Sequence, residues 1–401
     1  KKLKSIKMIS NLHGGLVFPG DEEKLLTHSE EQKHTEEEKV DKDDINKEFC
    51  PRTSELDFDE RFRLCKSIGE EIIDEEWLKD LLKKKENFIC YDGFEPSGRM
   101  HIAQGLLKSI NVNKITQSGG IFVFWVADWF AMLNKKMDGD LEKIKDLGKY
   151  FIEIWKAVGM NLSNVKFLWA SDEINKRADE YWSMVMDIST KFTLNRILKC
   201  TQVMGRADGY ELSASQVFYP CMQAADIFFL KADVCQLGMD QRKVNMLAIE
   251  YAEKNNLKKP VIISHPMVMG LKKGQAKMSK SDPDSAIFME DTAKDVARKI
   301  KKAYCEPGDV TENPVLNYAE HIIFGLKDSW TLERPEEWGG NITYNSFEEL
   351  KTAYADCKLN PEDVKGNMIK TLNELLEPVR KHFAENEAAK ELLVKVKEYR
   401  K

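Results

Sequence analysis

Short apolar runs that alternate with stretches of helical spacing constrain the fold of this chain more than any other feature. The runs lie at residues 88–91, 121–127, 165–170, 233–237 and 261–264, and helical patterns around 99–115, 150–158 and 216–230 fall between them. Strands joined by helices pack most readily as a parallel sheet with helices on both faces. The sequence therefore predicts a doubly wound α/β domain.

Three further segments depart from this alternation. Residues 1–55 are rich in charged side chains and poor in large apolar ones, which predicts a mobile extension. Residues 172–215 form a long insertion between the third and fourth predicted strands. The insertion could be a helical segment without a binding role, a subunit contact or an RNA-binding face. From about residue 290 the strand pattern disappears and helical spacing recurs at 292–304, 316–324, 346–355 and 361–381, which predicts a second, mostly helical domain.

Composition excludes several classes of protein. The chain has 401 residues, of which 42% are hydrophobic and 32% charged, and its longest apolar run stops at Asp128, so no membrane-spanning helix is expected. The eight cysteines form no CxxC pair and no close set with histidine, which argues against a structural metal and favours reduced thiols. A net charge of −6 argues against unspecific coating of nucleic acid. Any RNA partner must therefore meet a localised basic face.

The first chemical motif follows the first predicted strand. Pro96, Ser97 and Gly98 form a turn between that strand and a helix, and His101 is expected in the first turn of the helix. Such a turn directs backbone N–H groups and the positive end of the helix at the crevice above the sheet, which suits a triphosphate. His101 could then donate a hydrogen bond to phosphate oxygens, although a lone histidine would be interpreted as an ordinary surface residue.

The second motif is the pentapeptide at residues 277–281, Lys-Met-Ser-Lys-Ser. A given five-residue string occurs by chance in roughly one in ten thousand chains of this length, so the match is specific. Gly270 and Gly274 flank it, which indicates a mobile cationic loop that closes over a nucleotide. Lys277 and Lys280 would neutralise the charge that builds up on departing pyrophosphate. A solvated lysine-rich loop would explain the lysines but not the Met-Ser pair between them.

A third cluster indicates the substrate. Tyr219, Gln223 and Asp226 are spaced i, i+4 and i+7, which places them on one face of a helix that would otherwise be apolar. Asp226 can accept the proton of a phenolic hydroxyl, and Tyr91, at the end of the first strand, can supply a second hydrogen bond. Such a pocket would reject phenylalanine by about four to five orders of magnitude. The alternative is a polar network between helix and strand that binds no ligand.

These motifs resemble those of class I aminoacyl-tRNA synthetases. Residues 96–104 are similar to the His-Ile-Gly-His signature, and residues 277–281 match the Lys-Met-Ser-Lys-Ser (KMSKS) signature. Residues 91–98, 217–226 and 238–243 resemble the tyrosyl-tRNA synthetases of eukaryotes and archaea, and the resemblance runs from about residue 56 to the C-terminus. It implies a Rossmann-like catalytic domain at 56–270, a KMSKS loop at 271–289, an anticodon-binding domain at 290–401 and a homodimer that uses the insertion at 172–215.

The resemblance also implies an activity and its residues. Tyrosine would be activated by ATP with Mg²⁺ to tyrosyl-adenylate and then transferred to tRNA(Tyr), in the cytoplasm, with an organellar form as the alternative compartment. The catalytic residues implied are His101, Lys277 and Lys280. The tyrosine-binding residues implied are Tyr91, Tyr219, Gln223, Asp226 and Gln241. The ATP-binding residues implied are Gly93, Glu95, Ser97, Gly98, His101, Ala103, Gln104, Lys277, Met278, Ser279, Lys280 and Ser281. The tRNA-binding residues implied are Arg242 at the acceptor end, and Trp338 and Asp363 at the first anticodon base.

The chain departs from the family pattern in three places. Ala103 and Gln104 replace the Gly and His of the first signature, Asn360 replaces a histidine of archaeal relatives, and Trp129–Phe130 stands where relatives often carry Leu-His. The last change predicts a bulkier wall of the tyrosine pocket. Two other functions stay open at this point: a tryptophanyl-tRNA synthetase, whose substrate offers only an N–H donor, and a synthetase-like binding or signalling protein without catalysis.

Overall fold

The computed structural model describes residues 51–201, 213–280 and 282–399, all of which belong to one compact unit spanning Ile45–Lys401. The predicted mobile extension, residues 1–55, therefore lies almost wholly outside the described residues. Its last part is held in place, because the backbone N–H of Arg52 donates to Asn164 Oδ1 over 2.7 Å. None of the described helices is long and apolar enough to cross a membrane.

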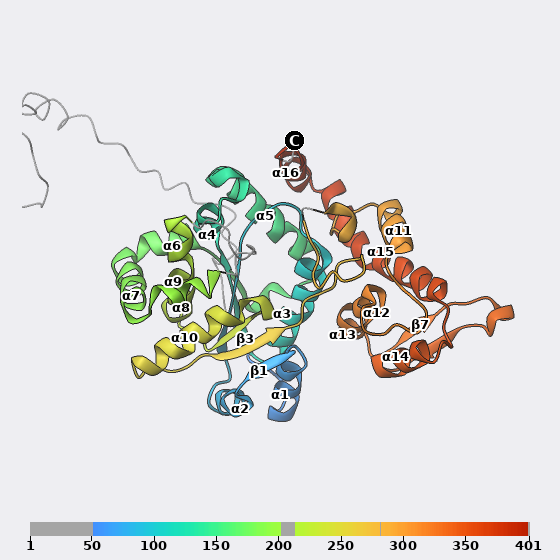
Figure 1. Cartoon of the computed structure of the whole chain (residues 1–401), viewed down its shortest axis with the longest axis horizontal. Helices are drawn as coiled ribbons and strands as arrows, with labels where there is room; N and C mark the ends of the chain where they lie inside the picture. Colours follow the sequence, from blue (N-terminus) through green and yellow to red (C-terminus); the bar gives the residue numbers. More distant parts are fainter. Residues whose placement is uncertain (1–50, 202–212, 281, 400–401) are drawn as a thin grey trace, which may run out of the picture. The chain divides into compact units, whose positions relative to one another are not determined.

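A six-stranded sheet forms the centre of the fold (Figure 1). Its strands are β1 (Glu71–Ile73), β2 (Phe88–Phe94), β3 (Gly120–Val126), β4 (Val165–Trp169), β5 (Val234–Gly238) and β6 (Val261–His265). The strand order is β1-β6-β5-β2-β3-β4, and every pair is parallel except β1 with β6. The five predicted strands and the doubly wound α/β class are thus confirmed. The antiparallel edge strand β1 was not predicted, because three residues are too few to show a periodic pattern.

Alternate residues of the central strands enter two different hydrophobic cores. Phe122 and Phe124 of β3 join the core that also holds α1, α3 and α5, whereas Trp125 joins the core built with α7, α9 and α10. Side chains of a strand point alternately to the two faces of its sheet, so both faces are buried by helices. This explains why the strands appear in the sequence as continuous apolar runs.

Helices follow the predicted order. Before the KMSKS loop they are α1 (Phe58–Lys66), α2 (Glu75–Lys84), α3 (Lys108–Gln117), α4 (Asp128–Leu133), α5 (Leu141–Ala157), α6 (Ala170–Lys176), α7 (Ala178–Lys191), α8 (Leu194–Leu198), α9 (Ala214–Phe229) and α10 (Arg242–Lys254). The described part of the insertion at 172–215 is helical. In Figure 1 its green helices lie together with α9 and α10.

The segment after the KMSKS loop is mostly helical, as predicted. It contains α11 (Ala293–Lys302), α12 (Pro314–Tyr318), α13 (Phe324–Leu326), α14 (Phe347–Ala355), α15 (Pro361–Glu385) and α16 (Glu387–Glu398). The prediction that strands disappear here was wrong, since β7 (Trp330–Leu332) and β8 (Ile342–Tyr344) form an antiparallel hairpin. Each strand has three residues, too short for alternation to be visible. Helix α16 packs on α5, and His382 of α15 contacts Glu153 of α5 at 2.7 Å.

The direction of the chain crossovers changes beside β2. The strands β2, β3 and β4 succeed one another toward one edge of the sheet, whereas β5 and β6 lie on the other side of β2. Ligands of open α/β sheets bind at the carboxyl ends of the strands next to such a switch point. A site is therefore expected where β2 and β5 end.

Candidate active site

A cavity of about 610 Å³ opens at the carboxyl ends of β2, β5 and β6. It brings together nearly all the residues that the sequence assigned to catalysis, tyrosine and ATP. Those that line it are Tyr91, Gly93, Glu95, Ser97, His101, Ala103, Gln104, Tyr219, Gln223, Asp226, Gln241, Lys277, Met278, Ser279 and Lys280. Gly98 is not part of the lining, but it forms the adjacent turn with φ +60°, a conformation that favours glycine. Ser281 lies outside the described residues.

His101 lies just before its helix and not in the first turn, which corrects the prediction. Its carbonyl accepts the N–H of Gly105 over 3.0 Å, and the helix begins with a π-helical turn, η1 (Ala103–Leu107). Its Nδ1 is buried and has no hydrogen-bond partner among the described residues. Burial, and next the charge of Lys280, lower the pKa of His101 to about 3. The ring is therefore neutral at pH 7 and can donate one hydrogen bond into the cavity.

The KMSKS loop lies against the first motif. Lys280 Nζ donates to the carbonyl oxygen of Ser97 and lies 3.4 Å from Ser97 Oγ. Lys277 lies 3.8 Å from the carboxylate of Asp240 at the end of β5. Met278 is buried, and its N–H donates to the Val268 carbonyl over 3.2 Å. Both lysines of the pentapeptide thus face the cavity, together with His101.

Asp226 is the centre of a buried cluster of hydroxyl groups. Its Oδ1 accepts the Tyr181 hydroxyl over 2.8 Å, and its Oδ2 lies 3.4 Å from the Tyr91 hydroxyl. Burial raises the pKa of Asp226 well above its ordinary value, and the hydrogen bonds from the two tyrosines oppose this only in part. Tyr181, on α7, was not predicted. The spacing of Tyr181, Val185 and Ile188 shows only that this face of α7 is buried, not that it meets α9.

A second polar group in the cavity combines two residues of α9 with Glu95, which follows β2, and Gln241 of the short helical turn η5 (Met239–Gln241). The Tyr219 hydroxyl donates to Glu95 Oε1 over 2.6 Å, and Gln223 Nε2 donates to Gln241 Oε1 over 3.0 Å. Because the proton of Tyr219 is donated to Glu95, the Tyr219 oxygen can still accept a hydrogen bond. The Gln223 side-chain oxygen is an acceptor in the same way. This arrangement suits a cationic donor such as an ammonium group.

The cavity also contains polar residues that the sequence did not single out. Lys108 of α3 forms a buried ion pair of 2.6 Å with Asp92 of β2. Glu95 accepts from Asn134 over 3.1 Å and lies 3.7 Å from Lys136. For Asp92 the only sequence signal is its place directly after Tyr91, at the end of a buried strand.

The predicted change in the pocket wall involves one of its two residues. Phe130 lines the cavity, and its ring lies edge-on to Tyr219 with centroids 5.0 Å apart. Trp129 is half-buried and is not part of the lining. An apolar aromatic ring therefore lies beside Tyr219 in the cavity wall.

The three residues assigned to tRNA lie outside the cavity lining. Arg242 forms an ion pair of 2.6 Å with Glu71 of β1. Trp338 belongs to the short helical turn η8 (Glu336–Trp338) between β7 and β8, and 62% of its surface is exposed. Asp363 lies in the first turn of α15, where the side chain of Asn360 caps the helix by accepting the N–H of Glu362 over 2.9 Å. Asn360 is therefore the N-cap of α15.

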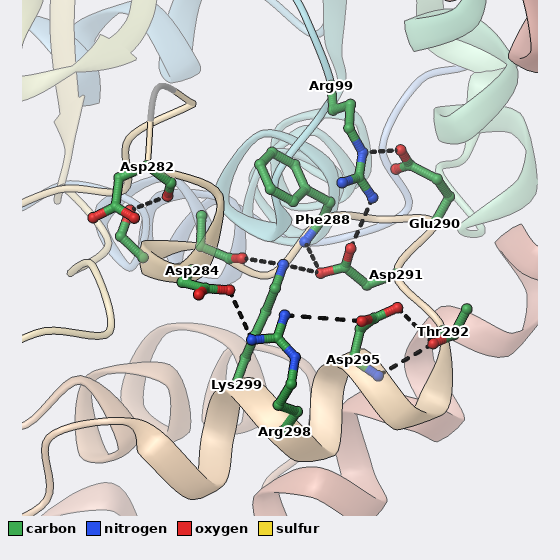
Figure 2. A network of polar contacts seen from close by, with 12 residues as sticks. Arg99, Asp282, Asp284, Phe288, Glu290, Asp291, Thr292, Asp295, Arg298 and Lys299 are labelled. Carbon is green, nitrogen blue, oxygen red and sulfur yellow. Dashed lines mark hydrogen bonds and ion pairs between the residues drawn. The ribbon is translucent and has the colours of Figure 1, made fainter. Parts of the chain in front are cut away.

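A network of charged side chains joins Arg99 to the residues after the KMSKS loop (Figure 2). Arg99, next to Gly98, donates to Glu290 and, over 2.7 Å, to Asp291. Asp291 also accepts Lys299 Nζ over 2.6 Å and the N–H of Phe288 over 2.9 Å. Residues that follow the KMSKS loop are thereby attached to the turn that precedes His101.

Within residues 51–201, 213–280 and 282–399, no group of three or more His, Cys, Asp or Glu side chains is placed to hold a metal ion. The carboxylates that line the cavity belong to Asp92, Glu95, Asp226 and Asp240. Mg²⁺ in nucleotide sites is commonly held by substrate phosphates with one or two carboxylates, so this lining is compatible with it.

Comparisons with known proteins agree on one family. Residues 83–377 match the profile of the class I tRNA synthetases (W and Y). The chain is 58% identical over 343 residues to the cytoplasmic tyrosine–tRNA ligase 1 of Arabidopsis thaliana, covering 85% of this chain and 89% of that protein. It is 37% identical over 358 residues to the tyrosine–tRNA ligase of Thermococcus sibiricus, covering 82% of this chain and 95% of that protein.

Solved structures give the same result. A tyrosyl-tRNA synthetase of Leishmania major in complex with tyrosinol superposes with a TM-score of 0.81 at 53% identity, covering 86% of this chain and 53% of that chain. The present chain thus spans about half the length of the Leishmania protein. The tyrosyl-tRNA synthetase of Pyrococcus horikoshii in complex with L-tyrosine has a TM-score of 0.79 at 34% identity, covering 85% of this chain and 100% of that chain.

Proposed function

The chain belongs to the class I tRNA synthetases (W and Y), and we propose that within this family it is a tyrosine–tRNA ligase. It activates L-tyrosine with ATP, releases pyrophosphate, and transfers the tyrosyl group to the 3′ end of tRNA(Tyr). The similarity to tyrosine–tRNA ligases over more than four fifths of the chain supports this assignment.

The observation that carries the choice of tyrosine is the buried cluster around Asp226. A phenolic hydroxyl needs an acceptor for its proton and a donor for its oxygen, and Asp226 and Tyr91 supply these two groups. Tyr181 holds Asp226 in place over 2.8 Å, so the acceptor is oriented before the substrate arrives. The indole of tryptophan carries only a donor and would leave a buried hydroxyl without its partner, which costs about 1–3 kcal/mol.

The neighbouring polar group binds the α-amino group of the substrate. The ammonium donates to the oxygens of Tyr219, Gln223 and Gln241, and Glu95 lies 2.6 Å behind Tyr219 as a compensating negative charge. With both ends of tyrosine fixed, its carboxylate is directed at the α-phosphate of ATP. Positioning of this kind can lower the activation free energy by several kcal/mol without a covalent enzyme intermediate.

The two motifs act on the phosphates. The tyrosine carboxylate attacks the α-phosphorus, the bond to the bridging oxygen breaks, and the negative charge passes to pyrophosphate. Lys277 and Lys280 lie where they can neutralise that charge, and neutral His101 donates a hydrogen bond. Gly93, Ser97, Gly98, Ala103, Gln104, Met278, Ser279 and Ser281 complete the ATP site. Mg²⁺ would be held by the phosphates beside Glu95 and Asp240, where it supplies further charge neutralisation.

The same proposal assigns the remaining parts of the chain. Residues 56–270 form the catalytic domain, residues 271–289 form the KMSKS loop, and residues 290–401 form the anticodon-binding domain. Trp338 stacks on the first anticodon base, and its exposure supports this, because an unpaired base needs an accessible aromatic face. Asp363 hydrogen-bonds the same base, and Arg242 reads the first base pair of the acceptor end.

We place the subunit contact of a homodimer on the insertion at 172–215. Trp182 and Met186 of α7 are exposed and lie four residues apart, hence on one face of the helix, and Leu194 of α8 is also exposed. Large apolar side chains gathered on one surface are typical of protein interfaces. The compartment proposed is the cytoplasm, as the name of the Arabidopsis relative states for that protein.

Amino-acid-dependent exchange of pyrophosphate with ATP tests the activity and its substrate. The purified protein should exchange pyrophosphate with tyrosine and not with tryptophan or phenylalanine. Asp226→Ala should abolish the exchange with tyrosine while the far-ultraviolet circular dichroism stays unchanged. Exchange driven by tryptophan would make the protein a tryptophanyl-tRNA synthetase, and a folded protein without any exchange would favour the binding or signalling alternative.

A further inference from the structure

The backbone around His101 is paired with the last residues of the KMSKS loop. The N–H of Ile102 donates to the Ile287 carbonyl over 2.9 Å, and the N–H of Met289 donates to the Met100 carbonyl over 2.9 Å. His101 and Phe288 are opposite each other in this antiparallel bridge. The position of His101 therefore depends on residues 287–289, although these lie far away in the sequence.

The helix after His101 approaches the same segment closely. A Cβ atom on Gly105 would lie 2.2 Å from Met289 Sδ, so a larger residue here would displace the Met289 side chain. On the other side of the bridge, Lys280 Nζ donates to the Ser97 carbonyl. The turn at 97–105 and the segment at 280–291 thus touch at both ends of the bridge.

Arg99 links these two segments by its side chain. Its guanidinium donates to Glu290 and Asp291 from two different nitrogens and lies 4.2 Å from the centroid of the Phe288 ring (Figure 2). The side chains of Glu290 and Asp291 are 4% and 3% exposed, and that of Arg99 is 20% exposed. The planar guanidinium can reach two carboxylates at fixed angles, which the single ammonium of lysine cannot do.

The partners of Arg99 are themselves fixed. Asp291 accepts Lys299 of α11 and the N–H of Phe288, and its carbonyl accepts Arg380 Nε of α15 over 2.8 Å. Lys299 is buried and also donates to the Ala286 carbonyl over 2.9 Å. The two cations and two carboxylates at the centre of the network balance each other. Any movement of Arg99 would therefore be resisted by α11 and α15.

We propose that Arg99 is a positioning residue that holds the turn with Ser97 and His101 against the segment after the KMSKS loop, so that His101 and Lys280 face the same cavity. This inference rests on the proposed function, for which it names a residue that touches neither substrate. A misplacement of about 1 Å at a reacting centre can cost on the order of a hundredfold in rate, so a modest shift of this junction is sufficient.

The test compares Arg99→Lys with Arg298→Lys, a matched control. Arg298 lies on α11 beside Lys299 and also contacts two carboxylates, Asp284 at 2.8 Å and Asp295 at 3.9 Å, but on the exposed side of the helix. Arg99→Lys should lower kcat for pyrophosphate exchange at least tenfold per active site, counted by titration of tyrosyl-adenylate. KM for tyrosine should stay within twofold, because the Asp226 cluster is not part of the network. Arg298→Lys should change neither constant.

Two further measurements separate positioning from a general loss of structure. The double variant Arg99→Lys with Lys280→Ala should lose less kcat than the product of the losses in the two single variants, since both changes act at the same junction. Hydrogen exchange of peptides 98–106 and 285–292 should be faster in Arg99→Lys than in the control, with other regions unchanged. If Arg99→Lys unfolds the protein, Arg99→Met with Glu290→Gln keeps the charges balanced and should give the same kinetic pattern.

Several outcomes would overturn the inference. Equal kcat values in the two lysine variants, fully multiplicative effects with Lys280→Ala, or unchanged hydrogen exchange in peptides 98–106 and 285–292 would each contradict the role of Arg99. A wild-type protein that fails to exchange pyrophosphate with tyrosine would contradict the proposed function instead. The hydrogen-exchange comparison would still decide whether Arg99 holds the two segments together.

Discussion

Replacement of Asp226 by asparagine should lower activity and change how stability depends on pH. Asparagine has the shape of aspartate but presents an amide N–H₂ where the carboxylate has an acceptor oxygen. The hydroxyl of the substrate, or that of Tyr91 at 3.4 Å, would then lose its acceptor in a site that is almost completely buried. An unpaired buried donor costs about 1–3 kcal/mol, which corresponds to a loss of about 5- to 150-fold in kcat/KM for tyrosine.

The pH dependence of stability should change because ionisation of this buried carboxyl group is unfavourable. Burial keeps the pKa of Asp226 well above its ordinary value of 3.8, so the folded chain binds this proton more tightly than the unfolded chain does. The contribution of this tighter proton binding to stability is complete below the pKa that Asp226 has in the unfolded chain. It is lost as the pH rises toward the pKa that Asp226 has in the folded chain. Asparagine does not ionise, so the Tm of the wild type should fall relative to that of Asp226→Asn as the pH rises from 4 to 7.

The assays are pyrophosphate exchange with tyrosine and phenylalanine, and thermal unfolding at several pH values. Asp309→Asn is the control, because Asp309 also accepts a tyrosine hydroxyl, that of Tyr304 over 2.8 Å, but away from the cavity. The control should keep full activity and full discrimination. Unchanged kcat/KM for tyrosine in Asp226→Asn, or a Tm difference between the two proteins that stays constant from pH 4 to pH 7, would refute the reasoning.

Three other changes test separate parts of the site. Lys108→Met should lower the free energy of unfolding in urea by about 3–5 kcal/mol, because it leaves Asp92 buried without its partner at 2.6 Å. Asp92→Asn in the same chain should restore most of this loss. Additive effects of the two changes would contradict the pairing. Burial lowers the pKa of His101 to about 3, so its ring should show no titration between pH 5 and 8 in NMR spectra. A transition near pH 6.5 would show instead that the ring is exposed to solvent. Trp338→Ala should leave adenylate formation unchanged and weaken tRNA binding by about 1–3 kcal/mol, the value of one stacked base, and unchanged affinity would exclude stacking.

The sequence predicted the features that depend on local spacing. The positions of Tyr219, Gln223 and Asp226 on one helix face follow from the period of the α-helix, and the five parallel strands follow from their length and apolar character. The lining of one cavity by both motifs also follows, because the carboxyl ends of parallel strands lie at one edge of the sheet. These predictions needed no knowledge of which helix packs on which.

The remaining contacts join residues that local patterns do not connect. Tyr181 reaches Asp226 across 45 residues, and Arg99 reaches Glu290 across 191 residues. Periodicity shows that a face is buried but not which side chain it will meet. The strands β1, β7 and β8 were not predicted for a different reason. A strand of three residues shows too little alternation of apolar and polar side chains to be distinguished from a loop.

Charging of unfractionated tRNA with labelled tyrosine tests the central claim most directly. The purified protein should transfer tyrosine, in an ATP-dependent reaction, to a single class of tRNA that carries the tyrosine anticodon, and Asp226→Ala should abolish the transfer. Transfer of tryptophan, or tyrosine-dependent exchange of pyrophosphate without any transfer to tRNA, would contradict the account.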